Sequence, residues 1–169
     1  LSTINAAAIA GAGRIIVVDK DPFKFDLARA FGATDIVDAN LGDTVKRIRD
    51  MTNGGVHYAF ECIGLKTTAE QSFSCLRPGG AATIIGMIPV GTKIELNGFD
   101  FLNERRIQGS AMGSNRFRTD MPRLVDLYMQ DRLRLKEMVS NRIALKDINE
   151  GFAALKSGGL ARNVIVFEK

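Results

Sequence analysis

The chain has 169 residues, of which 46% are hydrophobic and 25% are charged, and its formal net charge is +4. This balance is typical of one globular domain, and it excludes disorder, a collagen-like repeat and a coiled coil as the main state. No apolar run approaches the roughly 20 residues that span a bilayer, and the basic residues are spread out. We therefore expect neither a membrane nor a nucleic-acid partner.

Cysteine and histidine are scarce in the sequence. Cys62, Cys75 and His57 are the only residues of these two types, too few for a disulfide framework or for a zinc site within the chain. We therefore expect no metal ligand here, and a reduced, cytoplasmic location.

Predicted helices and strands alternate through the first half of the chain. The Ala-rich segment 1–13 predicts a helix that is already under way at Leu1. No start methionine or targeting pattern is present, so we expect a fragment of a longer protein. Further helices are predicted over residues 21–31, 43–52 and 67–76, and strands over 14–19, 34–37, 56–61 and 81–85. Pro78-Gly79-Gly80 is interpreted as the break between the last helix and strand of this set.

The rhythm loosens after Gly86. Strands are predicted over 93–96, 106–109 and 163–167, a short helix over 99–103, and longer helices over 120–130 and 147–156, the last ended by Gly158-Gly159. Strands and helices that alternate at this spacing predict βαβ units and an α/β fold with a parallel, doubly wound sheet.

Asp19 is the strongest single signal of function. A dinucleotide-binding βαβ unit carries a strand, a glycine-rich turn, a helix and a second strand that ends in an acid about 20 residues beyond the glycines. Asp19 ends such a strand, where a carboxylate accepts hydrogen bonds from the ribose hydroxyls and repels a 2′-phosphate. The structural alternative is a helix cap, a role that Asp21, next to Pro22, fits better.

Five stretches, taken in order, cover essentially the whole chain and resemble one family. They are GAGRIIVVDKDPFKFDLARAFGATDIVD, GGVHYAFECIG, LRPGGAATIIGMIP, ERRIQGSAMGS and INEGFAALKSGGLARNVIVF. The ordered set resembles the cofactor-binding part of zinc-dependent medium-chain alcohol dehydrogenases, of the class III, formaldehyde-dehydrogenase-like and bacterial branches. The resemblance implies an NAD-dependent oxidoreductase that acts on an alcohol or aldehyde.

The resemblance also implies what lies outside the chain. Counting back from Asp19 puts the glycine turn before Leu1, so residues 1–169 are expected to form an NAD-binding Rossmann domain without its first, central strand and glycine-rich turn. The sheet should then be split or closed up at that place. The GroES-like catalytic domain, with the zinc ligands and the proton relay, is expected elsewhere. No catalytic residue is assigned here, and the isolated chain is expected to be inactive.

Cofactor-binding residues follow from the resemblance position by position. Asp19 and Lys24 match the acid and the lysine that hold the adenosine ribose. Cys62, Ile63 and Gly64 form a turn against the cofactor, with Ile63 near the adenosine. Two further segments line the nicotinamide, where the carbonyls of Ile85 and Ser110 and the amide of Met112 would hold the carboxamide; their members are Ile85, Gly86, Met87, Ser110, Ala111 and Met112. Arg162 matches the arginine that binds the pyrophosphate.

Two other classes of function stay open. The string LRPGG and an acid after the second strand also occur in Rossmann-like methyltransferases, although their usual antiparallel end hairpin is not predicted, because the closing strand is expected to be parallel. The region from Lys93 to Gly109 matches the part through which family members join cofactor domains edge to edge, so a homo-oligomer, dimer or tetramer, is expected. A chain with only this part could instead be a non-catalytic oligomerising or nucleotide-binding module.

Overall fold

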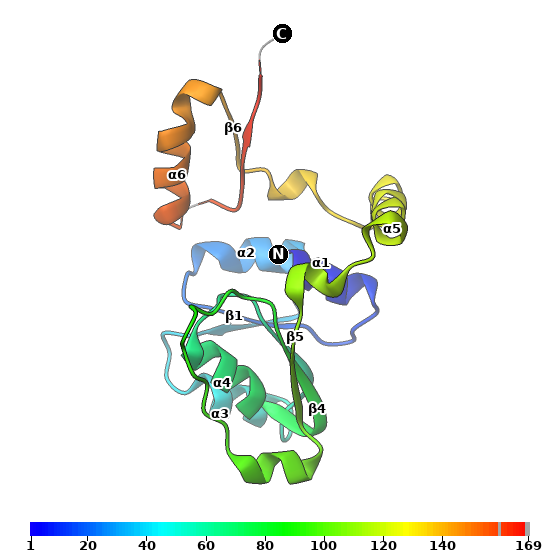
Figure 1. Ribbon diagram of the computed structural model, residues 1–169, viewed down its shortest axis with the longest axis vertical. Helices are drawn as coiled ribbons and strands as arrows, with labels where there is room; N and C mark the ends of the chain where they lie inside the picture. The colour runs from blue at the N-terminus through cyan, green and yellow to red at the C-terminus, as the bar shows by residue number, and fades with distance from the viewer. Residues whose placement is uncertain (159, 168–169) are drawn as a thin grey trace. The chain divides into compact units, whose positions relative to one another are not determined.

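The computed structural model describes residues 1–158 and 160–167 (Figure 1). The chain divides into two compact units, which are described separately. The first holds Leu1–Val17, Asp21–Asp35 and the chain from Arg118 onward, and the second holds Val18–Lys20 and Ile36–Phe117. No helix among the described residues is long and apolar enough to cross a membrane.

Helices and strands alternate as the sequence predicts. The helices are α1 (Ser2–Ile9), α2 (Phe23–Ala30), α3 (Thr44–Met51), α4 (Lys66–Ser74), α5 (Phe117–Met129) and α6 (Ile148–Lys156). The strands are β1 (Ile16–Asp19), β2 (Asp35–Asp38), β3 (Val56–Glu61), β4 (Leu76–Ile84), β5 (Arg106–Gly109), β6 (Asn141–Ile143) and β7 (Asn163–Ile165). Short 3₁₀ turns cover Gly98–Asn103, Ala111–Ser114, Lys136–Met138 and Leu145–Asp147.

The helix starts show how local sequence sets the boundaries. Asp43 caps α3, and its side chain accepts a hydrogen bond from the amide of Lys46. The expected cap of α2 is wrong by one residue, because the helix begins at Phe23 and Pro22 occupies the N-cap position. Asp21 precedes this position and accepts a hydrogen bond from the amide of Phe23 at 3.2 Å. α5 begins earlier than predicted and contains Pro122 in its interior. Of the predicted Gly158-Gly159 stop, Gly159 lies outside the described residues.

A parallel three-stranded sheet forms the centre of the second unit, in the order β3-β4-β5 (Figure 1). Helix α4 connects β3 to β4, and Phe73 from this helix joins Leu76 and Ala82 in a buried core. Val56, Ala59, Leu96 and Ile107 are partly buried against that core. Residues of β3, β4 and β5 therefore form one apolar layer with α4.

The predicted break at Pro78-Gly79-Gly80 is wrong, because β4 runs through it from Leu76 to Ile84. The pairing with β3 shifts between Val56↔Leu76 and Tyr58↔Ala81, so extra residues of β4 bulge at this point. Gly79 takes a positive φ of 75° there, and a bulge is where a strand accommodates a proline without losing a ladder hydrogen bond.

The predicted strand over 93–96 is also wrong; no strand forms there. Side-chain contacts with α4 hold this segment instead. Lys66 forms an ion pair with Glu95 at 2.9 Å, the amide of Glu95 donates to Glu70, and Leu96 contacts the core. The Lys-Ile-Glu-Leu pattern is thus satisfied by one helix face rather than by a sheet.

The strands form three separate sheets rather than one. Within the described part of the chain, β1 pairs only with β2, β3 only with β4, and β6 with β7. The α/β class with parallel strands is confirmed, and the sheet is split between β1 and β3, as expected. β7 is parallel, but its partner is β6, a short strand that the sequence did not reveal.

In the first unit, α1 is held through one buried amide side chain. The Nδ2 of Asn5 donates to the carbonyl of Arg132, and its Oδ1 accepts from the amide of Arg134. Gly32 lies so close to Ala8 that an added Cβ would come within 2.8 Å of the alanine Cβ. These contacts fix the helix that the Ala-rich sequence predicts.

A bidentate ion pair ties the residues before β1 to the start of β2. Arg14 donates to both carboxylate oxygens of Asp35, at 2.6 and 2.9 Å. The guanidinium and the Thr34 hydroxyl lower the pKa of Asp35 from 3.8 to about 2. The stability from this pair is therefore complete above the unfolded pKa and is lost as the pH falls toward the folded one.

We expect Asp35→Asn to lower the melting temperature at neutral pH, with a difference from wild type that is constant down to about pH 5 and shrinks below about pH 4. Melting curves of the full-length protein at a series of pH values measure this difference. Asp26→Asn, in an exposed helical pair with Arg29, is the control and should change little. A difference that stays the same down to about pH 3 would contradict the role of the carboxylate charge.

Candidate functional site

The three strands of the second unit end in register at one edge of the sheet. Glu61 of β3 pairs with Ile84 of β4, which pairs with Gly109 of β5. The three segments predicted to contact the cofactor, 62–64, 85–87 and 110–112, follow directly from these strand ends. Ligands of parallel α/β sheets bind outside the carboxyl ends of the strands, so the structure brings these segments together at the expected edge.

Glu61 organises the first of these loops, although the sequence analysis did not select it. Glu61 is buried, with 3% of its surface exposed. Its Oε1 accepts hydrogen bonds from the amides of Ile63 and Gly64 and from the Thr68 hydroxyl, at 2.7–2.8 Å. Its backbone carbonyl accepts from the amides of Ile85 and Gly86. The available signal was an acidic residue at the end of an otherwise apolar strand.

The first and second loops contact each other through two glycines. A Cβ on Gly64, whose φ is 91°, would come within 2.5 Å of the Met87 carbonyl oxygen. A Cβ on Gly86 would come within 2.1 Å of the Gly64 nitrogen and 2.5 Å of the Glu61 Oε2. Both positions therefore require glycine because backbone lies against backbone.

Large apolar side chains are exposed around this edge. The exposed fraction is 64% for Ile63, 43% for Ile85 and 91% for both Met87 and Met112. Such a concentration of apolar groups beside main-chain donors and acceptors is typical of a surface that binds flat, partly polar rings. Met112 and Gly113 have positive φ values of 48° and 74°, so the third loop turns sharply after Ser110.

The other predicted residues lie at separate places. Asp19 is the half-buried last residue of β1, and its carbonyl accepts from the amide of Ala39. Lys24 lies on α2, with its ammonium 3.8 Å from Asp21. Arg162 precedes β7 and is held by Ser140, whose amide donates to the Arg162 carbonyl at 2.8 Å. Lys24 and Arg162 belong to the first unit, and Asp19 to the second.

Neither cysteine has the surroundings of a metal ligand or a nucleophile. Cys75 is buried, and desolvation raises the pKa of its thiol to about 11. Cys62 is exposed, with its Sγ 3.9 Å from the Phe60 carbonyl. No group of three or more His, Cys, Asp or Glu side chains that could hold a metal ion occurs among residues 1–158 and 160–167.

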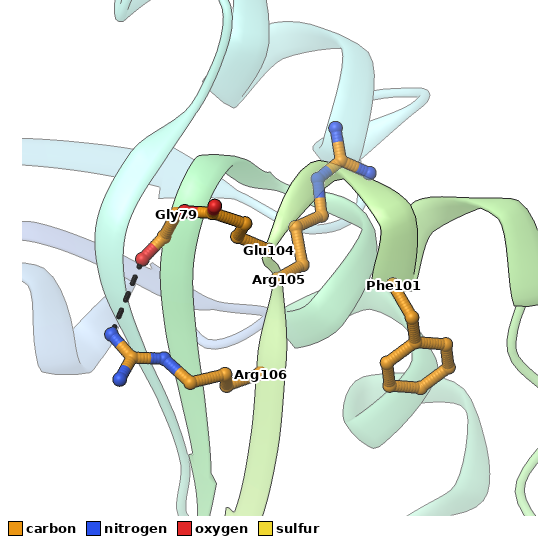
Figure 2. Close-up of a pocket in the computed structure, with 5 residues that line it drawn as sticks. All are labelled: Gly79, Phe101, Glu104, Arg105 and Arg106. Carbon is orange, nitrogen blue, oxygen red and sulfur yellow. Dashed lines mark hydrogen bonds between the residues drawn. The ribbon is translucent and has the colours of Figure 1, made fainter.

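A hollow of about 410 Å³ lies elsewhere on the second unit, lined by Gly79, Phe101, Glu104, Arg105 and Arg106. Figure 2 shows the consecutive Arg105 and Arg106 side chains pointing apart, and the Arg106 guanidinium donates a hydrogen bond to the Gly79 carbonyl. Arg106 begins β5, so this hollow lies at the amino ends of the strands. It is therefore distinct from the edge that carries the three loops.

We expect Gly86→Ala to lower the free energy of unfolding by about 1–3 kcal/mol, because its Cβ overlaps the Gly64 backbone. Gly109→Ala is the matched control: it ends the neighbouring strand, and an added Cβ there meets nothing within 4 Å. Denaturant unfolding of both variants in the full-length protein measures the contrast. Equal stability of the two variants would show that the loops do not approach as closely as described.

Comparison with known proteins places the chain in a family. Residues 1–129 match the zinc-binding dehydrogenase family. The class-3 alcohol dehydrogenase of Zea mays is 35% identical over 171 residues, which cover 99% of this chain and 45% of that protein. The alcohol dehydrogenase zinc-binding domain protein of Burkholderia ambifaria has a TM-score of 0.93 and 33% identity, over 98% of this chain and 45% of that one.

A second solved structure bears on the cofactor. A zinc-binding dehydrogenase from Sinorhizobium meliloti, bound to NADP, has a TM-score of 0.90 and 30% identity, over 98% of this chain and 48% of that one. The chain thus spans less than half the length of these relatives. Because the family match covers more than half of the chain, and the strand ends and loops lie as in a Rossmann-like fold, the chain belongs to the zinc-binding dehydrogenase family.

Proposed function

We propose that the chain is the NAD-binding part of a zinc-dependent alcohol dehydrogenase, which transfers a hydride from an alcohol to NAD. The observation that carries the proposal is the shared edge where Glu61, Ile84 and Gly109 end their strands in register and the three loops begin. Under this proposal residues 1–169 are a Rossmann domain without its first strand and glycine turn, and the GroES-like catalytic domain lies outside the chain.

The proposed contacts with a dinucleotide follow the family resemblance. Asp19, at a strand end, would accept hydrogen bonds from the ribose hydroxyls, with Lys24 reaching the same sugar. Ile63 would contact the adenosine. The carbonyls of Ile85 and Ser110 and the amide of Met112 would orient the carboxamide, with Gly86, Met87 and Ala111 beside them, and Cys62 and Gly64 in the adenosine turn. Arg162 would pair with the pyrophosphate.

The bound cofactor supplies the hydride acceptor at C4 of its nicotinamide. This chain's residues would bind that ring, fix which face meets the alcohol, and exclude water with the exposed apolar side chains of Ile85, Met87 and Met112. In this proposal the metal that would polarise the alcohol oxygen, and the relay that would take its proton, are held by the GroES-like domain outside the chain. The isolated chain should therefore be inactive.

The cellular location is proposed on chemical grounds. Two cysteines in 169 residues are too few for a disulfide framework, and such a composition is typical of proteins of a reducing compartment such as the cytoplasm.

The region from Lys93 to Gly109 is proposed as a contact between copies of the protein. Phe99 and Leu102 in the 3₁₀ turn Gly98–Asn103 are 67% and 78% exposed, and the hollow of Figure 2 lies in the same region. Strand β5 pairs with β4 on one side only, within the described part of the chain. An exposed apolar turn beside an open strand edge favours pairing across a two-fold axis.

Cofactor choice tests the proposed function. The full-length protein should prefer NAD over NADP, because a 2′-phosphate would lie against the Asp19 carboxylate, and Asp19→Gly should reduce that preference by roughly tenfold or more. Steady-state kinetics with both cofactors measure it. Asp38→Asn is the control, since Asp38 ends the neighbouring strand β2 in the same way. A wild type that prefers NADP, as the bound cofactor of the Sinorhizobium relative allows, would refute the assignment of Asp19.

Light scattering tests the proposed contact. The full-length protein should have the mass of a dimer or tetramer at micromolar concentration, and Leu102→Asp should lower that mass. Leu41→Asp, at an apolar side chain that is 63% exposed in another loop, should leave it unchanged. A monomeric wild type would rule the contact out.

A further inference from the structure

Glu61 differs from Ser72 and Arg105, two other buried polar residues of the second unit, in what it binds. Ser72 donates to the carbonyl of Ala69 within α4, and Arg105 forms an ion pair with Asp100 at 2.7 Å. Glu61 instead binds the backbone of two loops, through its carboxyl group on one side and its carbonyl on the other. Both loops belong to the candidate cofactor site.

The carboxyl group bridges the loops physically. Its Oε1 takes three donors from the segment after β3, namely the amides of Ile63 and Gly64 and the hydroxyl of Thr68. Its Oε2 faces Gly86, where an added Cβ would come within 2.5 Å of that oxygen. Oε2 is buried and has no hydrogen-bond partner in the described structure, so the hydrogen bonds of the carboxyl group to the loop all run through Oε1.

The consequence is a defined position for two side chains. Ile63 precedes Gly64 and Met87 follows Gly86 in the sequence, so both flank the contact between these glycines, and both side chains are largely exposed. If Oε1 is removed, the amides of Ile63 and Gly64 lose their acceptor, and the Thr68 hydroxyl keeps only the Leu65 carbonyl at 3.1 Å. The loop must then shift to find water or another partner for the two amides. A shift in one loop is passed to the other because their backbones are in contact.

We propose that Glu61 is a positioning residue for the cofactor: it holds the Cys62–Gly64 turn against residues 85–87, so that the adenosine and nicotinamide sides of the site keep a fixed relation. This inference rests on the proposed function. Glu61 does not itself need to touch the cofactor, and Thr68 shares its role as one of the three donors to Oε1.

The experiment measures NADH affinity by nicotinamide fluorescence, together with the melting temperature, in the full-length protein. The variants are Glu61→Ala, Glu61→Gln, Thr68→Val and Thr68→Ser. Gln keeps one oxygen but places an amide group against Gly86. Thr68→Val keeps the shape of the side chain and removes its hydroxyl, whereas Thr68→Ser keeps the hydroxyl and removes the methyl group. The stability control is Asp43→Ala, which removes the cap of α3 and should lower the melting temperature without a change in NADH affinity.

We expect Glu61→Ala to weaken NADH binding by about tenfold or more and Thr68→Val by roughly threefold, with Thr68→Ser within about twofold of wild type. The double variant Glu61→Ala/Thr68→Val should bind no more weakly than Glu61→Ala alone, because both changes remove the hydrogen bond between the Thr68 hydroxyl and Oε1. If Glu61→Ala does not fold, the contrast between Val and Ser at position 68 decides the question.

Three results would overturn the positioning role. The first is unchanged affinity in Glu61→Ala and Thr68→Val. The second is an equal loss in Thr68→Val and Thr68→Ser. The third is an equal loss in Asp43→Ala, which would make the effect one of general stability. A wild type that does not bind NADH overturns the proposed function and this inference together, so the two failures are distinguishable.

Discussion

Close contact between two backbone loops governs the functional edge of this chain. At Gly64 and Gly86 the loops approach to distances at which no Cβ fits, and the Glu61 carboxyl group satisfies the amides that this approach buries. A buried amide without a partner costs about 1–3 kcal/mol, so a tight turn of this kind needs an internal acceptor. The carboxyl group meets that need without a longer loop.

The same edge depends on strand register. Because β3, β4 and β5 end at paired residues, their loops start side by side. In the proposed function, main-chain carbonyls and amides of these loops would hold the cofactor. A site built from carbonyls and amides tolerates many side chains, provided that the backbone path is kept. Glycine is required only where another backbone lies against it.

The sequence predicted those elements whose local pattern and tertiary contacts agree. Val56–Glu61 and Arg106–Gly109 were predicted with the bounds observed, because each is a short segment delimited by glycine or by charged residues. Pro78-Gly79-Gly80 was misread because a bulge and a chain break share the same residues. Segment 93–96 was misread because its alternation fits a strand, while contacts with α4 decide its structure. The β6 strand is too short to give a periodic signal.

The candidate site was less accessible to pattern analysis than the fold. Asp19 could be selected from its place at a strand end. Main-chain contacts such as those assigned to Ile85 and Ser110 do not require a particular residue type, so they could be assigned only from the family resemblance. Glu61 escaped notice because its partners are amides two and three residues ahead and a hydroxyl on the next helix, a set that only the folded chain assembles.

The exposed thioethers of Met87 and Met112 carry a chemical liability. Both sulfur-bearing side chains stand open at the edge that the proposed cofactor would cover. Conversion to the sulfoxide replaces a flexible apolar group with a polar, chiral one. The apolar edge of the site would then bind water. Occupancy of the site would then act as a shield, so that oxidative damage accumulates in the resting protein rather than in the loaded one.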